Sequence, residues 1–340
     1  MKAYIKFIFY NLLLLLLIIF IFEILLRLDN KIKLNGTSAN IFTYDELDNY
    51  QNTANFTGIS FGEKFYTDKD GYRIPYPNYI YPKNPQKKVL IMGDSVSFGV
   101  GIKEEYSFPG LLRKKFHKNQ IINASVTGYN IDNYKFLTDK IVDNNKFDLG
   151  ILVLCLNDII SFKNTLSDSA NESLQVNIIE RSRESKILNN INIFLRDKSM
   201  IYLYIKGIFT DPSFRYFKID TMNYNYEIES RLKKIKNIND KFISANIPFI
   251  VIIAPYEYQI RKFTKSNDIN YLEDELILPQ IKLSNYFESE KIKFIDPYNR
   301  FKAIQLSNDK PLFIKFDPMH LNREGHEIIF SIISEIISNN

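Results

Sequence analysis

The longest apolar run of the chain lies near its N-terminus. Residues Phe7–Leu26 are almost wholly apolar, and Leu12–Leu17 is unbroken. Twenty helical residues at about 1.5 Å each span about 30 Å, the thickness of a bilayer core. The run exceeds the apolar core of a cleaved signal peptide, and no A-x-A cleavage pattern follows promptly. The sequence therefore predicts a transmembrane anchor over residues 1–29.

Shorter apolar runs recur along the rest of the chain and predict the buried strands of a parallel sheet. They are Lys88–Met92, Ile121–Ile122, Phe147–Leu156, Ile247–Ile253 and Lys293–Ile295. Helical patterns lie among them, at Ser107–His117, Asn133–Asn144, Tyr226–Ala245 and Glu327–Ile337. In the last of these, isoleucines four residues apart form an apolar stripe. This alternation predicts βαβ units, and so an α/β fold with helices on both faces of the sheet.

Two segments lack this rhythm. Residues 30–87 are rich in Asn, Gly, Tyr, Asp and Pro without a sustained period, which predicts a stalk followed by an irregular, aromatic-rich segment. Residues 161–225 begin with polar, Ser- and Asn-rich sequence and continue with helical and aromatic pieces. We expect them to form an insertion within a catalytic domain that spans residues 88–340.

Composition and charge exclude several classes of protein. The net charge is only +5 over 340 residues, and the basic clusters Arg113–Lys115 and Lys233–Lys234 lie within predicted helices, so we expect no nucleic-acid partner. The single cysteine, Cys155, lies in an apolar run and rules out an intrachain disulfide. No P-loop, complete dinucleotide fingerprint or zinc motif is present. We therefore expect no metal and no cofactor.

Polar residues follow the carboxyl ends of several predicted strands. In parallel α/β folds, ligands bind at these ends. Ser95 stands where the first strand turns toward a helix, and His320 and Asp317 precede the last helix. A serine nucleophile needs a base, and the base needs an orienting acid. Gly128 could donate a backbone N–H, and Asn157 its side-chain amide, to a developing oxyanion. These types of residue predict acyl-transfer chemistry.

Four short segments of this sequence resemble, in the same order, the sequence motifs of the SGNH (GDSL) hydrolase family. The matching residues are Gly93-Asp94-Ser95, Gly128, Asn157-Asp158 and Asp317-x-x-His320. The resemblance implies a three-layer α/β/α sandwich with a flavodoxin-like sheet. It also implies a triad of Ser95, His320 and Asp317, with an oxyanion hole made by Ser95, Gly128 and Asn157. One position departs from the family, because Cys155 stands where a glycine is usual.

The resemblance implies a serine esterase. The expected substrate is an acyl ester, such as acetyl, on a glycan or lipid of the cell envelope. Asp70–Arg73 and Glu23–Arg27 also look like membrane-anchored bacterial members, whose catalytic domain lies outside the cytoplasmic membrane. The Lys and Arg residues that flank the apolar run do not decide its orientation. An O-acyltransferase acting on a cell-surface polysaccharide and a non-catalytic envelope-binding protein on the same fold remain open as alternatives.

Overall fold

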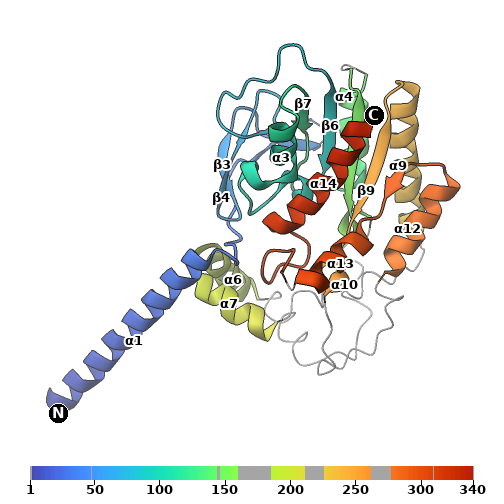
Figure 1. Cartoon of the computed structure of the whole chain (residues 1–340). Coiled ribbons are helices and arrows are strands. Elements are labelled where there is room, and N and C mark those ends of the chain that lie inside the picture. The colour runs from blue at the N-terminus through green and yellow to red at the C-terminus, as the bar shows by residue number, and fades with distance from the viewer. Residues whose placement is uncertain are drawn as a thin grey trace. The chain divides into compact units, whose positions relative to one another are not determined.

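The structure is a computed structural model that describes residues 2–46, 48–143, 146–159, 185–210, 226–261, 277–308 and 310–339. The chain divides into two compact units. One comprises residues 1–36 and 171–211, and the other comprises residues 37–170 and 212–340. Figure 1 shows the elements of both.

An eight-stranded mixed sheet forms the centre of the larger unit, in the order β10-β9-β8-β6-β7-β5-β4-β3. Five of these strands are parallel to one another: β6 (Lys88–Gly93), β7 (Gln120–Asn123), β8 (Leu149–Cys155), β9 (Phe249–Ala254) and β10 (Phe294–Ile295). Numbered along the chain, their spatial order is 2-1-3-4-5, the flavodoxin-like order. Every residue of β8 is buried, as expected of a strand covered on both faces.

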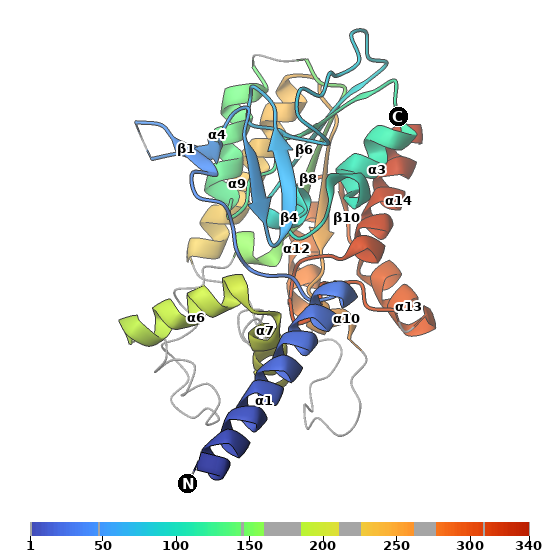
Figure 2. The ribbon, with the colours of Figure 1, turned by 90° about the vertical axis from the view of Figure 1, so that its left-hand side faces the viewer.

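Helices cover both faces of this sheet, with α4 and α9 on one side and α3 and α14 on the other (Figure 2). Their bounds are α3 Phe108–Lys115, α4 Ile131–Ile141, α9 Tyr226–Ser244 and α14 Arg323–Asn339. The shorter helices are α2 Ser95–Phe98, η1 Glu104–Tyr106, η2 Leu156–Asp158, α10 Glu257–Ile260, α12 Leu278–Ser289 and α13 Tyr298–Asn308. The predicted α/β/α sandwich with a flavodoxin-like sheet is confirmed. The five apolar runs and four helical patterns each correspond to an element of the described chain.

Within the predicted irregular segment, residues 42–74 contain five short strands. Antiparallel strands β3 (Thr57–Ser60), β4 (Glu63–Thr67) and β5 (Arg73–Ile74) extend the sheet beyond β7. Strands β1 (Phe42–Tyr44) and β2 (Tyr50–Asn52) form a separate pair. These strands are two to five residues long, too short for a periodic pattern to be recognised in the sequence. The segment from Thr37 onward thus belongs to the same unit as the sheet.

The smaller unit contains three described helices, α1 (Lys2–Asp29), α6 (Lys186–Lys198) and α7 (Met200–Phe209). Helix α1 is long and apolar enough to cross a membrane over residues 4–29. The predicted insertion at 161–225 lies partly outside the described residues, at 161–184 and 211–225. Its described part, residues 185–210, contains α6 and α7.

Candidate active site

Ser95 lies at the carboxyl end of the central strand β6 and begins helix α2. The turn before it needs glycine, because a Cβ atom at Gly93 would clash with the side chain of Ser97 and lie 2.8 Å from the carbonyl oxygen of Val153. Asp94 caps the helix, and its Oδ1 accepts a hydrogen bond from the backbone N–H of Val96 at 2.9 Å. This local geometry fixes the direction of the Ser95 side chain, which is only partly buried.

His320 and Asp317 share one tight loop before α14. Oδ1 of Asp317 accepts hydrogen bonds from the backbone N–H groups of Met319 at 3.0 Å and His320 at 2.9 Å. This is the turn that an aspartate forms with the backbone two residues on. The loop is held from outside as well, since the Pro318 carbonyl accepts from the backbone N–H of Glu257 at 2.8 Å.

The structure brings Ser95, His320 and Asp317 into one hydrogen-bonded chain. Nε2 of His320 lies 2.8 Å from Ser95 Oγ, and its Nδ1 lies 2.6 Å from Asp317 Oδ2. Burial would lower the pKa of His320, but the Asp317 charge and hydrogen bond outweigh it and hold that pKa above its usual value. Burial opposes ionisation of Asp317, yet His320 holds the pKa of Asp317 below its usual value. An ionised Asp317 therefore orients the imidazole so that Nε2 faces the serine hydroxyl.

Asp94 lies beside this chain and is fully buried. Its Oδ2 is 3.3 Å from Ser95 Oγ, and its carboxylate also accepts a hydrogen bond from the Asn157 side chain. Burial raises the pKa of Asp94, although the Val96 N–H and the nearby His320 partly offset this. The Asn157 amide carries two N–H hydrogens, so one donor can bind Asp94 while the other stays available to a ligand. Asp94 thus links the side chains of Asn157 and Ser95.

Asp158 does not join the triad. Its Oδ2 accepts hydrogen bonds from the Tyr134 hydroxyl at 2.8 Å and the Cys155 backbone N–H at 2.9 Å, and burial raises its pKa well above the usual value. It therefore shapes the turn that follows β8. The Cys155 thiol is buried in the same turn, and burial raises its pKa well above the usual value, which makes it a poor nucleophile.

Gly128 lies in the exposed part of the loop after β7, with a φ of 81°. This loop is joined to β6, the strand before Ser95, because the Val126 N–H donates to the Gly93 carbonyl at 3.1 Å and the Ala124 N–H donates to the Ile91 carbonyl at 2.9 Å. Among the hydrogen bonds of the described residues, none connects Gly128 with the triad. The loop therefore stands next to the Ser95 strand without a hydrogen bond between Gly128 and Ser95 among the described residues.

Phe61 is a site residue that the sequence did not reveal. It occupies the two-residue turn between β3 and β4 together with Gly62, and both have positive φ values, 47° and 78°. Two consecutive positive φ values are the signature of a type I′ hairpin turn. The turn brings the Phe61 ring edge-on to the His320 imidazole, with centroids 5.2 Å apart. A Phe-Gly pair between short strand-like segments was the available signal.

A buried ionic cluster supports the segment of chain that follows Ser95 and helix α2. The Arg73 guanidinium pairs with Glu104 at 3.0 Å and donates to the carbonyls of Phe98, of Gly99 at 2.6 Å, and of Ile102 at 2.7 Å. Glu104 also pairs with Arg113. All three charged side chains are buried. The short strand β5, which carries Arg73, thereby anchors the segment between α2 and α3.

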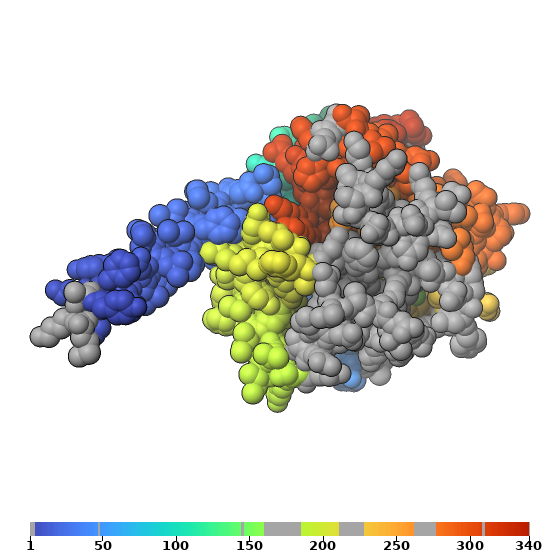
Figure 3. All heavy atoms as spheres, turned by 90° about the horizontal axis from the view of Figure 1, so that it is seen from below, coloured from blue at the N-terminus to red at the C-terminus, as the bar shows by residue number. Residues whose placement is uncertain are grey.

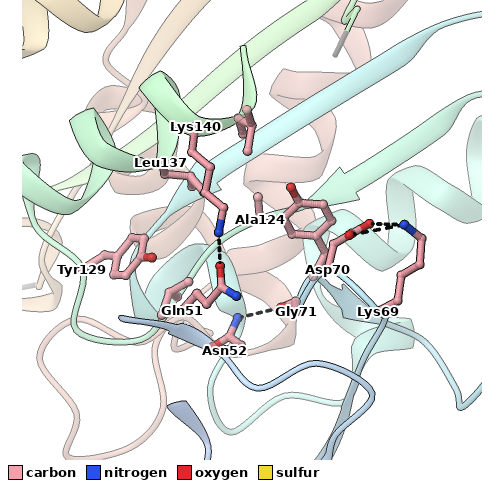
Figure 4. A pocket seen from close by; sticks show the side chains of 12 residues that line it. Gln51, Asn52, Lys69, Asp70, Gly71, Ala124, Tyr129, Leu137 and Lys140 are labelled. Carbon is pink, nitrogen blue, oxygen red and sulfur yellow. Dashed lines mark hydrogen bonds and ion pairs between the residues drawn. The ribbon is translucent and has the colours of Figure 1, made fainter. Parts of the chain in front are cut away.

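A cavity of about 150 Å³ lies behind the Gly128 loop (Figure 4). Ala124, Val126 and Tyr129 of the loop form part of its wall. Lys140 Nζ donates to Gln51 Oε1 at 2.7 Å across it. The buried Asn52 amide donates to the carbonyls of Gly71 at 3.1 Å and Ser125 at 3.0 Å. Asn52, the last residue of β2, thus joins this strand to the loop after β7 that contains Ser125 and Gly128.

No protein-family model and no curated protein matches this sequence. Solved structures to which this chain is similar include an acetyl xylan esterase, AlAXEase, at 14% identity and a TM-score of 0.45, covering 74% of this chain and 99% of that one. A putative G-D-S-L family lipolytic protein from Desulfitobacterium hafniense is 15% identical, with a TM-score of 0.42 and the same coverages. The esterase EstA from Pseudoalteromonas sp. is 13% identical, with a TM-score of 0.40, covering 75% of this chain and 98% of that one.

Proposed function

We propose that this chain is a serine esterase of the SGNH type, with Ser95 as nucleophile, His320 as general base and Asp317 as the acid that orients it. The observation that carries the proposal is the pair of hydrogen bonds at His320, 2.8 Å to Ser95 and 2.6 Å to Asp317. A serine within hydrogen-bond reach of a base that is itself oriented by a third group is the arrangement of an activated nucleophile.

In the proposed reaction, Ser95 Oγ attacks the ester carbonyl while His320 Nε2 takes the serine proton. The tetrahedral intermediate collapses, the C–O bond to the alcohol breaks, and His320 returns the proton to the departing oxygen. Water then attacks the acyl-enzyme with His320 again as base, releasing the acid and regenerating Ser95. Asp317 keeps its negative charge throughout and stabilises the imidazolium that forms transiently.

The oxyanion requires donors at the carboxyl end of the sheet. We assign this role to the backbone N–H groups of Ser95 and Gly128 and to the free N–H of the Asn157 amide. The hydrogen bond from Asn157 to Asp94 supports the assignment, because it fixes the amide beside the nucleophile before substrate arrives. Asp94 and Asp158 support the site through their own hydrogen bonds rather than by reacting.

We further propose that α1 anchors the protein in the cell membrane, with the catalytic unit on the extracytoplasmic side. An anchored esterase would meet acyl groups on envelope glycans or lipids, so a small acyl ester such as acetyl on one of these is the proposed substrate. The length and apolar character of α1 support the anchor. Its side of the membrane rests on the resemblance to anchored bacterial hydrolases.

The test is hydrolysis of p-nitrophenyl acetate by the full chain in detergent, compared with Ser95→Ala and His320→Ala. We expect both variants to lose turnover by about 10⁴-fold or more. Equal turnover by the wild type and His320→Ala would overturn the proposal and favour a non-catalytic binding protein.

The same assay with an added glycan acceptor separates a hydrolase from a transferase. A hydrolase releases the acyl group to water at an unchanged rate. Faster loss of the acyl group together with an acylated glycan would identify an O-acyltransferase.

A further inference from the structure

Helices α6 and α7 of the smaller unit expose apolar side chains. The exposed fractions are 72% for Ile187, 51% for Leu188, 50% for Ile191, 62% for Phe194, 50% for Ile205, 56% for Ile208 and 69% for Phe209. Single exposed apolar residues are normal on a protein surface, but gathered ones mark an interaction site. Figure 3 shows the two helices in yellow-green and yellow, beside the blue helix α1 of the same unit.

The polarity of this helical pair is reversed relative to a water-soluble hairpin. At 3.6 residues per turn, Ile187, Leu188, Ile191 and Phe194 lie on one side of α6, and all four are exposed. The polar residue Asn192 faces α7, where its Oδ1 accepts hydrogen bonds from the Tyr202 hydroxyl at 2.8 Å and from Lys206 Nζ at 2.6 Å.

Helix α7 likewise exposes apolar side chains and directs its polar groups toward the other helix. Ile205, Ile208 and Phe209 are spaced three and four residues apart on its exposed side. Its one charged residue, Lys206, is directed instead toward Asn192. The polar groups of Asn192, Tyr202 and Lys206 therefore satisfy one another between the two helices while the two apolar stripes are exposed, an arrangement suited to apolar surroundings rather than to water.

Helix α7 is bound to the end of the apolar run in α1. The Glu23 carboxylate accepts hydrogen bonds from the backbone N–H groups of Met200 at 3.0 Å and Ile201 at 2.9 Å. Arg27 pairs with Glu23 at 2.7 Å and donates to the Lys198 carbonyl at 2.7 Å. These bonds account for a carboxylate within an apolar helix, since an ionised group there needs partners.

These contacts also determine how deep α7 lies in a membrane that α1 spans. If Phe7–Leu26 spans the bilayer core, then Glu23 and Arg27 lie near its boundary, and the start of α7 lies there too. Apolar helices bound at this level meet the region between headgroups and acyl chains. Arg196 and Lys198 at the end of α6, and the exposed Lys31 after α1, supply positive charge for lipid phosphates at the same level.

We propose that α6 and α7 form an interfacial membrane-binding hairpin, whose exposed apolar side chains insert into the same leaflet boundary that α1 crosses. The proposal rests on α1 being a membrane span. It assigns to this described part of the 161–225 segment a second, in-plane attachment to lipid. The membrane-embedded part of the protein would then be a helical cluster rather than a single helix.

The sequence contains no tryptophan, so one introduced tryptophan reports on its own surroundings. The full chain would be reconstituted in vesicles of phosphatidylcholine and phosphatidylglycerol at a 3:1 ratio, carrying Phe194→Trp or Phe209→Trp. Phe9→Trp in α1 reports insertion of the span itself. Ile193→Trp is the matched control, because Ile193 is also exposed but lies on the opposite side of α6 from the apolar stripe.

We expect Phe194→Trp and Phe209→Trp to show blue-shifted emission, quenching by lipids brominated near the carbonyl end of the acyl chain, and weak quenching by aqueous iodide. Ile193→Trp should be quenched more by iodide and less by bromine. Bromine quenching of Phe9→Trp with strong iodide quenching at both hairpin positions would overturn the proposal while leaving the span intact. A Phe9→Trp signal without bromine quenching would remove the span and the proposal with it. Protection of both hairpin positions from iodide and bromine alike would indicate a second copy of the chain as the occupant and would also overturn it.

Discussion

The ring of Phe61 meets the imidazole of His320 edge-on, with centroids 5.2 Å apart and planes at 76°. Phe61 stands in a hairpin turn of the antiparallel part of the sheet, whereas His320 lies in the loop before the last helix. The antiparallel strands thus do more than extend the sheet, because their turn places an aromatic ring against the His320 imidazole.

Phe61→Ala should lower turnover by about two- to ten-fold. An aromatic pair of this geometry is worth about 0.5–1.5 kcal/mol, and about 1.4 kcal/mol corresponds to ten-fold in rate. The measurement is kcat/KM for p-nitrophenyl acetate at a pH where His320 is neutral. Phe56→Ala is the matched control, since Phe56 belongs to the same hairpin but its ring pairs with Phe65. Equal kinetics for Phe61→Ala and the control would remove Phe61 from the site.

The activity should rise with pH as His320 loses its proton. A protonated imidazole cannot accept the serine proton, and Asp317 holds the pKa of His320 above its usual value despite burial. The rising limb should therefore lie above about pH 6.5, the ordinary histidine value. The measurement is kcat/KM as a function of pH, which reports ionisation of the free enzyme.

Asp317→Asn should move this limb to lower pH, because it removes the charge that stabilises the imidazolium. It should also lower the rate by roughly 10³–10⁴-fold, as in other serine triads, since the tautomer and orientation of His320 are no longer fixed. A limb at the same pH in both proteins would show that Asp317 does not act on His320 in the reaction.

Asn157→Ala should lower kcat by about 10²–10³-fold with little change in KM, through loss of one oxyanion donor. Asn157→Asp keeps the shape of the side chain but removes both amide N–H groups, so the loss should be at least as large. Circular dichroism of both variants controls for folding. Unimpaired turnover by Asn157→Ala would exclude this amide from the oxyanion hole.

His326 should make the protein less stable as the pH falls. It is buried at the start of α14, where its Nδ1 accepts a hydrogen bond from the Phe108 N–H at 3.3 Å. Burial, together with the nearby Arg73, lowers the pKa of His326 to about 3. The folded state therefore keeps this group neutral, whereas the unfolded chain takes up a proton below about pH 6.5.

A neutral His326 contributes its full stability above about pH 6.5. This contribution decreases as the pH falls from about 6.5 to about 3, and the total loss is up to about 5 kcal/mol. The measurement is the free energy of unfolding in urea between pH 7 and pH 4.5. His326→Gln should flatten this dependence relative to the wild type, while His117→Gln, at an exposed histidine, should leave it unchanged. A slope for His326→Gln that equals that of the wild type would contradict the account.

The sequence was sufficient for the parallel sheet and for naming Ser95, Asp317 and His320 as candidates, because both leave local signals. Strands such as β8 are continuous apolar runs, and Ser95, Asn157 and His320 each stand in a short motif next to a predicted element. The hydrogen bond between Ser95 and His320 joins residues 225 positions apart. The sequence still suggested that they meet, because ligands in such folds bind at the carboxyl ends of the strands.

The antiparallel strands and their contacts could not be predicted in the same way. Strand β5 has two residues, so it carries no period, and its side chain Arg73 looks like any surface arginine in the sequence. That Arg73 is buried against Glu104 follows only from the pairing of β5 with β7. Phe61 likewise reaches His320 only because the hairpin is part of the sheet.

Covalent labelling tests most directly whether Ser95 is the activated nucleophile that we propose. The full chain in detergent would be treated with a fluorophosphonate probe, and the modified peptide would be identified by mass spectrometry. We predict one label on Ser95, no label on Ser95→Ala, and slow labelling of His320→Ala. A folded wild-type protein that stays unlabelled, or a label that persists in Ser95→Ala, would contradict the assignment of this site as a serine esterase.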